Sequence, residues 1–188
     1  MFANILINPL FSLLPYFVKH IHGGGAMDLA LILGIFQMGS LIGAMFIMLK
    51  NFIPQFKNIV LAVFIAFIGL FILGLSSPRF FFTMGLGSLI IGLALGTIDI
   101  MIISFLQINI PSELQGRVFS ILFMLVKSIL PIAVFLTGSL GEVFGLSMIY
   151  IINPLLGFGL VIYLTIGSRI FEFDQNRVQR TKVTSISN

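Results

Sequence analysis

The stretch from Phe80 to Gln107, FFFTMGLGSLIIGLALGTIDIMIISFLQ, decides the fold of this chain. Asp99 is its only charged side chain, and apolar residues and glycine make up most of the rest. A helix needs about 20 mainly apolar residues to cross the hydrocarbon core of a bilayer. The stretch is long enough to do so, and it therefore predicts a transmembrane helix.

The whole chain has a similar composition. Of its 188 residues, 59% are hydrophobic and only 9% are charged, and the mean hydropathy is +1.18. Such a chain has too little polar surface to cover a water-soluble globule, so we expect the lipid bilayer to surround it. The net charge of +4 does not indicate nucleic-acid binding, because the Lys and Arg residues are neither clustered nor interleaved with aromatic side chains. We predict an all-α integral membrane protein.

Polar, proline and glycine-rich breaks divide the apolar sequence at intervals that fit membrane-spanning helices. We predict a bundle of six transmembrane helices, over about residues 2–18, 28–49, 59–75, 80–107, 118–140 and 146–166. Pro111 lies in the most polar of the breaks and is placed to begin a new helix. Residues 1–168 then form one transmembrane domain, and residues 169–188 form a polar cytoplasmic tail.

The positively charged residues predict the orientation, because Lys and Arg are retained on the cytoplasmic side during insertion. Lys19 and Arg79 fall on one side of the predicted bundle. Most of the others fall on the opposite side, at Lys50, Lys57, Arg117, Arg169, Arg177, Arg180 and Lys182. We therefore expect a multi-pass protein of the cell membrane with both termini in the cytoplasm.

The sequence lacks the residue patterns of the common catalytic and cofactor sites. It has no cysteine, which excludes disulfides, zinc-thiolate sites and thiol catalysis, and it has no phosphate-binding G-x-x-x-x-G-K-[ST] motif. His20 and His22 are two residues apart, so they would point in different directions on a helix and are best interpreted as interfacial side chains. We expect no enzyme activity, no cofactor and no metal site.

Small residues recur at helical spacing in two of the predicted helices. Ser88, Gly92 and Gly96 follow one another at four-residue steps, and Gly39 and Gly43 repeat that spacing. Small side chains let two membrane helices approach closely and gain packing energy. These residues therefore predict close helix contacts rather than a substrate site.

Asp99 and Lys127 are charged residues inside predicted spans. A charge near the middle of the bilayer costs about 2.5 to 3.5 kcal/mol on the insertion scale. By helical rise, Asp99 lies about 12 Å and Lys127 about 15 Å from the same predicted membrane surface. We hypothesise a charge pair, or one of alternating partners, that couples protonation to substrate binding. The structural alternatives are a static salt bridge, or a snorkelling Lys127 and a protonated Asp99.

Two stretches resemble the C-terminal half of a major facilitator superfamily transporter, particularly the macrolide-efflux branch of drug exporters. Residues 110–120, IPSELQGRVFS, are similar to the signature P-x-E-x-x-G-R-V-x-S that leads into the eleventh helix of those exporters. The end of the fifth predicted helix is similar to the glycine-and-acid pattern that closes the same family helix, at Gly138, Gly141, Glu142 and Gly145.

A third stretch, from Gly43 through Lys50 to Lys57, resembles the family's loop motif G-x-x-x-D-R-x-G-R-R, although its acidic residue is absent here. The resemblance implies cytoplasmic gate-loop candidates at Gly43, Lys50, Lys57, Glu113, Gly116 and Arg117. It also equates the six predicted helices with family helices 7 to 12.

The resemblance implies a function that one half alone does not provide. Family members hold substrate between two six-helix halves and alternate access by rocking them. The chain is thus expected to be the C-terminal half of a proton-coupled multidrug antiporter that exports amphipathic drugs or metabolites. It is expected to be inactive without an N-terminal half that is encoded separately or lost. The alternatives are an uptake permease of the same fold, and a non-transporting remnant or membrane assembly partner.

Overall fold

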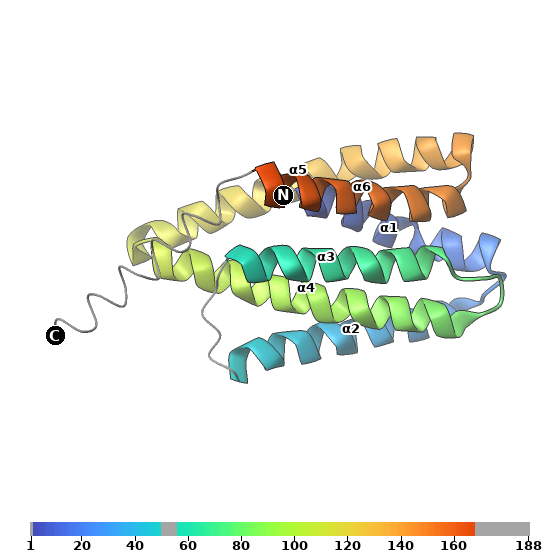
Figure 1. Cartoon of the computed structure of the whole chain (residues 1–188), viewed down its shortest axis with the longest axis horizontal. Coiled ribbons are helices and arrows are strands. Elements are labelled where there is room, and N and C mark those ends of the chain that lie inside the picture. Colours follow the sequence, from blue (N-terminus) through green and yellow to red (C-terminus); the bar gives the residue numbers. More distant parts are fainter. Residues whose placement is uncertain (1, 50–55, 168–188) are drawn as a thin grey trace.

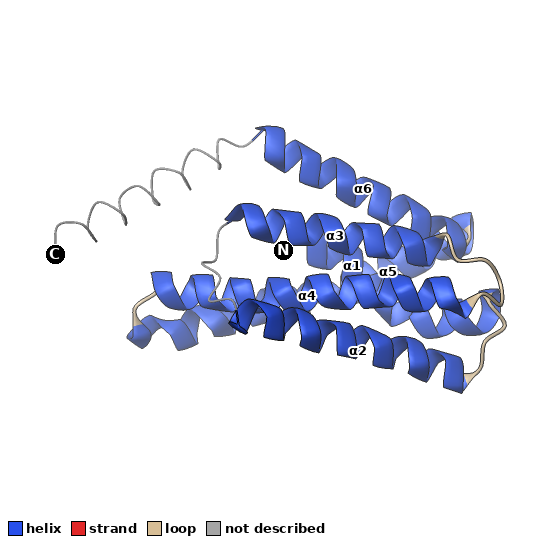
Figure 2. Ribbon diagram, turned by 60° about the horizontal axis from the view of Figure 1, so that its bottom comes forward, coloured by secondary structure: helices blue, strands red, loops and turns tan. Residues whose placement is uncertain are grey.

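The computed structural model describes residues 2–49 and 56–167, and its regular elements over those residues are all helical (Figures 1 and 2). They comprise a π-helix, η1, and six α-helices. In chain order the elements are α1 Phe2–Tyr16, η1 Phe17–Ile21, α2 Ala26–Leu49, α3 Phe56–Gly74, α4 Phe81–Asn109, α5 Ser112–Phe144 and α6 Leu146–Gly167. The predicted tail at 169–188 and Lys50 lie outside the described residues.

Helices α2 to α6 are long and apolar enough to cross a membrane by length and composition. The chain is therefore a multi-pass membrane protein, as the hydropathy predicted. Helix α1 has 15 residues and is too short to cross a membrane by itself, but η1 continues it without a break to Ile21. The helical segment is thus continuous from residue 2 to residue 21.

Successive helices run in opposite directions, so the connections collect at two ends of the molecule (Figure 1). The α1–α2, α3–α4 and α5–α6 connections lie at one end, which we name the α5–α6 end. The α4–α5 connection, the last turn of α2 and the first turn of α3 lie at the other end, which we name the α4–α5 end. Helix α4 packs along both α2 and α3, and α6 packs against α3.

Glycines bring the backbones of α2 and α4 into direct contact. A Cβ atom added at Gly39 of α2 would lie 2.6 Å from the carbonyl oxygen of Leu89 in α4. In the other direction, a Cβ atom at Gly96 of α4 would overlap the carbonyl oxygen of Ser40 in α2. The small residues that predict close packing also include Gly43 and Gly92, which meet the same interface, and Ser88, which is fully buried in α4.

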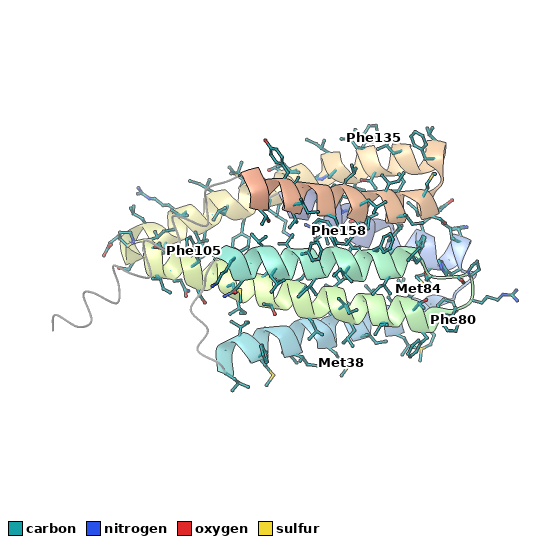
Figure 3. The ribbon with its side chains drawn as sticks, viewed as in Figure 1. Met38, Phe80, Met84, Phe105, Phe135 and Phe158 are labelled. Carbon is teal, nitrogen blue, oxygen red and sulfur yellow. The ribbon has the colours of Figure 1, made fainter. Side chains whose placement is uncertain are left out.

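The apolar core is formed mainly by α1, α3, α4 and α6, and its largest fully buried side chains include Tyr150, Phe17 and Phe67. The Tyr150 and Phe17 rings stack with their centroids 4.0 Å apart. The Tyr150 hydroxyl donates a hydrogen bond to the carbonyl oxygen of Leu10, which ties α6 to α1. Figure 3 shows Phe158 of α6 facing α3, whereas Phe135 of α5 points outward.

Helix α5 is longer than predicted, and it is the least buried of the long helices. It extends over Ser112–Phe144 instead of 118–140, and of its described side chains only Ala133 is buried. The predicted break before residue 118 is wrong from residue 112 onward. Polar residues can form a helix outside the hydrocarbon core. Pro111 precedes this helix and Glu113 lies in its first turn, where an acidic side chain is favourable. The α4–α5 hairpin extends past α2 and α3 (Figure 1).

Candidate functional site

The structure does not join Asp99 and Lys127. Both side chains are exposed, and in residues 2–49 and 56–167 neither of them makes an ion pair or a hydrogen bond. Because α5 begins at Ser112, Lys127 lies about 22 Å along its helix from the α4–α5 end, against about 15 Å for Asp99. The depths of Asp99 and Lys127 matched in the prediction only because the predicted helix began at residue 118 instead of Ser112. Each charge therefore needs compensation from water, lipid headgroups or another chain.

The gate-loop candidates occupy different environments. Gly43 lies inside α2, where its carbonyl oxygen accepts a hydrogen bond of 3.4 Å from the Thr97 hydroxyl, so it belongs to a helix interface. Lys57 is the second residue of α3 and is exposed. Lys50 lies outside the described residues. The helical position of Gly43 agrees with the predicted helix over residues 28–49, in which it was expected to pack against another helix.

The remaining gate-loop candidates, Glu113, Gly116 and Arg117, lie in the first turns of α5 at the α4–α5 end. A residue that was not among the candidates, Gln115, links α5 to α4 at this end. The Gln115 side chain donates hydrogen bonds of 3.2 Å to the carbonyl oxygen of Gln107 and of 3.0 Å to that of Ile110. Gln115 thus connects the start of α5 back to the end of α4.

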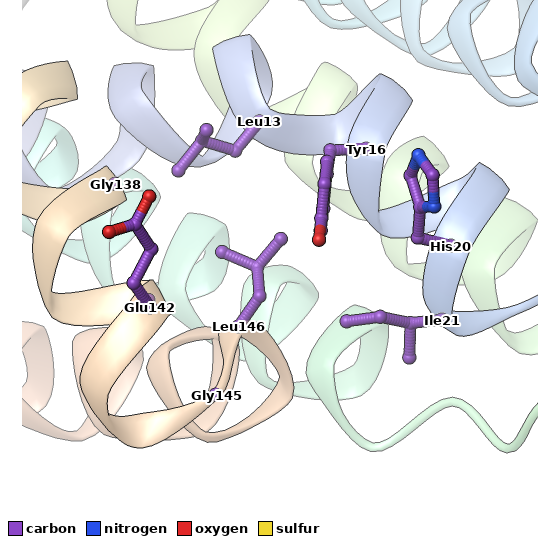
Figure 4. A pocket seen from close by; sticks show the side chains of 9 residues that line it. Leu13, Tyr16, His20, Ile21, Gly138, Glu142, Gly145 and Leu146 are labelled. Carbon is purple, nitrogen blue, oxygen red and sulfur yellow. The ribbon is translucent and has the colours of Figure 1, made fainter.

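A cavity of about 570 Å³ lies at the α5–α6 end, where α1 and η1 face the end of α5 (Figure 4). It has the size of many small-molecule sites. Tyr16, His20 and Glu142 contribute the polar side chains of its wall. The other lining residues are apolar or lack a side chain, namely Leu13, Ile21, Gly138, Gly141, Gly145 and Leu146.

The α5 wall of this cavity is open because glycines form much of it. A Cβ atom added at Gly138 would meet no atom within 4 Å, so the space beside this residue is empty. Gly145 has a φ of +83°, a value that favours glycine, and it turns the chain from α5 into α6. Glu142 lies between these positions and is exposed. Its carboxylate has no hydrogen bond or ion pair to any other described residue.

The opposite wall presents two aromatic rings. The Tyr16 and His20 rings stack with their centroids 4.4 Å apart. Figure 4 shows Tyr16 edge-on, with His20 on one side of its ring and Glu142 toward the other side. Because Tyr16 remains 55% exposed, its ring is accessible to a molecule entering the cavity.

The two histidines have different surroundings, although their sequence positions predicted similar interfacial roles. His22 is only 2% exposed, and its Nε2 atom lies 2.8 Å from the Ser76 hydroxyl and 3.1 Å from the Ser76 carbonyl oxygen. His22 therefore links the segment between η1 and α2 to the segment between α3 and α4. His20 is exposed beside the cavity.

A second cavity of about 310 Å³ lies between α5 and α6. Its wall is almost entirely apolar, and Leu140, Phe144 and Leu156 are among the side chains that line it. The amide nitrogen of Asn153, which also borders it, donates a hydrogen bond of 3.1 Å to the Leu6 carbonyl oxygen. The described residues contain no cluster of three metal-binding side chains.

Comparison with models of protein families, with curated proteins and with solved structures finds no match for this chain.

Proposed function

We propose that the chain is one half of a secondary active transporter that exports amphipathic compounds in exchange for protons. The observation that carries this proposal is the exposure of α5. This helix has 33 residues and a mainly apolar sequence, yet of its described side chains only Ala133 is buried. A second membrane-embedded half against α5 would cover this surface.

Lys127 strengthens the argument for a second half. It lies in the middle of α5, is exposed, and lies one helical turn from the exposed apolar side chains of Phe123 and Met124. Contact between this ammonium group and lipid hydrocarbon would cost about 2.5 to 3.5 kcal/mol on the insertion scale. An aqueous path or an acidic partner between two halves would remove that cost.

Asp99 supplies the proposed proton-coupling group. It lies within the membrane-spanning part of α4 and has no partner among the described residues. Protonated Asp99 is neutral and compatible with a closed, dehydrated state, whereas ionised Asp99 requires water or a cation. Alternation between these two states can bias the rocking of one half against the other.

The proposed arrangement has six spans, with α1 and η1 together making the first. Lys57 and Arg117 share the α4–α5 end, and Lys19 and Arg79 share the α5–α6 end. With the positive residues of the tail, this distribution supports a cytoplasmic α4–α5 end in the cell membrane. The sequence over residues 110–120 supports the exporter class by its resemblance to the drug-exporter signature.

Co-expression with a separately encoded six-helix half tests the proposal. We expect proton-gradient-dependent efflux of an amphipathic dye only when both halves are present, because one half cannot enclose a substrate. Asp99→Asn and Lys127→Met should each reduce the initial rate at least tenfold, about 1.4 kcal/mol in activation free energy. Asp28→Asn, which changes an acid outside the proposed path, is the control. Full efflux in both single variants contradicts the assigned roles.

The exposed face of α5 also suits a membrane assembly partner that transports nothing. In that case α5 would be covered by another membrane protein, and Lys127 would meet an acid of that protein. Membranes that contain the chain and its bound partner would then show no dye flux under any proton gradient. The same co-expression experiment separates this function from transport.

A further inference from the structure

We propose that the cavity between α1, η1 and α5 binds an organic ammonium ion with an apolar body. The nine lining residues all lie in the described part of this chain, so ligand binding to the cavity can be tested in the chain alone. The inference therefore goes beyond the proposed transport function and is tested separately from it.

The charge of the cavity selects a cation. Glu142 is the only carboxylate of the wall, and neither Lys nor Arg lines the cavity. Lys19 is adjacent to His20 in η1, but it is not part of the wall. A carboxylate that lacks a protein partner beside apolar surface attracts a cation more strongly than it would in bulk water. An anionic ligand would meet repulsion instead.

The aromatic wall favours an ammonium group over a metal ion. The stacked Tyr16 and His20 rings offer π faces, which attract alkylated ammonium groups. The described residues place only one carboxylate and one imidazole at this wall, which is fewer than the ligands of a stable metal site. The arrangement of a carboxylate opposite aromatic rings therefore suits a weakly hydrated organic cation.

The remaining wall accommodates an apolar body. Leu13, Ile21 and Leu146 provide apolar surface, and the glycines of α5 leave room beside it. The open space next to Gly138 leaves room for a small aromatic or branched alkyl group. Benzyltrimethylammonium combines a positive charge with a small apolar ring, and it therefore matches the charge and the apolar wall of this cavity.

The cysteine-free sequence permits a direct test with a single reporter thiol in the full chain, reconstituted in lipid nanodiscs. Gly138→Cys places the thiol in open space in the cavity. Ser77→Cys, on the exposed α3–α4 connection at the same end, is the control position. Reaction rates are measured with a cationic reagent, trimethylammonioethyl methanethiosulfonate, and with an anionic one, sulfonatoethyl methanethiosulfonate.

We expect Glu142→Gln to lower the ratio of cationic to anionic rates at position 138 about fivefold to tenfold, by removing the attracting charge. The ratio at position 77 should stay unchanged. Asp28→Asn removes another acid at the same end and outside the cavity, and it should leave the ratio at position 138 unchanged. A ratio at position 138 that does not respond to Glu142→Gln overturns the proposal.

Ligand protection gives a second, independent readout. Benzyltrimethylammonium should slow modification at position 138, and its neutral carbon isostere neopentylbenzene should not. The protection should be lost with Glu142→Gln and weakened about fivefold with Tyr16→Leu, which keeps an apolar side chain but removes the π face. Leu13→Cys serves as a second reporter if Gly138→Cys fails to fold. Equal protection by the ammonium ion and its isostere at the folded reporter overturns the assignment of a cation site.

Discussion

Helices α2 and α5 are both long and apolar, yet they have opposite relations to the rest of the bundle. Gly39 and Gly43 of α2 lie against backbone atoms of α4, so that no side chain fits between the two helices at those positions. A Cβ atom added at Gly116 or Gly138 of α5 would instead meet no atom within 4 Å. The same residue type thus marks a helix contact in one region and an open surface in the other. Glycine spacing predicts a close approach only where a second helix is present.

The largest expected effect comes from breaking the α2–α4 contact. Gly96→Leu would drive a side chain into the Ser40 backbone, which cannot move without separating the helices. We expect a loss of stability of about 3 kcal/mol or more, seen as a lower temperature of unfolding in detergent. Gly34→Leu on the exposed face of α2 is the matched control, because its added side chain meets open space. Equal stability of the two variants would contradict the close contact.

The next largest effect concerns the charge of Lys127 on the exposed helix α5. In the chain without a partner half, Lys127→Met removes the ammonium group from the exposed apolar surface of α5. We expect the apparent insertion free energy of α5 to improve by about 2.5 kcal/mol, measured by glycosylation mapping of inserted and non-inserted forms. Lys57→Met, at the start of α3, should change insertion much less because Lys57 lies at the end of its helix. No improvement with Lys127→Met would mean that α5 already shields this charge.

The packed region depends on one buried hydroxyl as well as on glycines. Tyr150→Phe leaves the ring stack with Phe17 in place but removes the hydrogen bond to the Leu10 carbonyl oxygen. We expect a loss of about 1 kcal/mol, the net contribution of one buried hydrogen bond. Tyr163→Phe on the same helix should be neutral, since Tyr163 is 75% exposed. Thermal unfolding of both variants measures the difference, and equal stabilities would show that the Tyr150 hydroxyl adds nothing.

The contrast between these regions also explains what the sequence could and could not predict. Apolar length is a local property, and it gave the helices of the bundle to within a few residues except at α5. The start of α5 is not predicted because the segment from Ser112 to Arg117 is mostly polar but still helical. The partnership of Asp99 and Lys127 could not be deduced, because depth along two helices does not say whether the helices face each other. The cavity at Glu142 depends on residues from α1 and α5 that are far apart in the sequence, and a single sequence contains no signal that pairs them.

The smallest expected effect tests whether α5 is free or covered. Gly116 is exposed in the second turn of α5, and an added Cβ atom would meet nothing within 4 Å. In the chain without a partner, Gly116→Ala should therefore stabilise α5 by about 0.5 to 1 kcal/mol, because alanine loses less backbone entropy than glycine on forming a helix. If a second half packs closely against this turn, the same substitution should weaken the assembly, because the methyl group would occupy the contact.

Comparison of Gly116→Ala with Ser120→Ala isolates this effect, since Ser120 is one turn further along the helix and its hydroxyl only donates to the carbonyl oxygen of Gly116. The stability of the free chain and the yield of the complex are measured for both variants. A gain in the free chain together with a loss of complex for Gly116→Ala alone would place a partner backbone at this turn. A gain in both measurements would instead leave this turn of α5 facing lipid or water, and any second half would then have to bind nearer to Lys127.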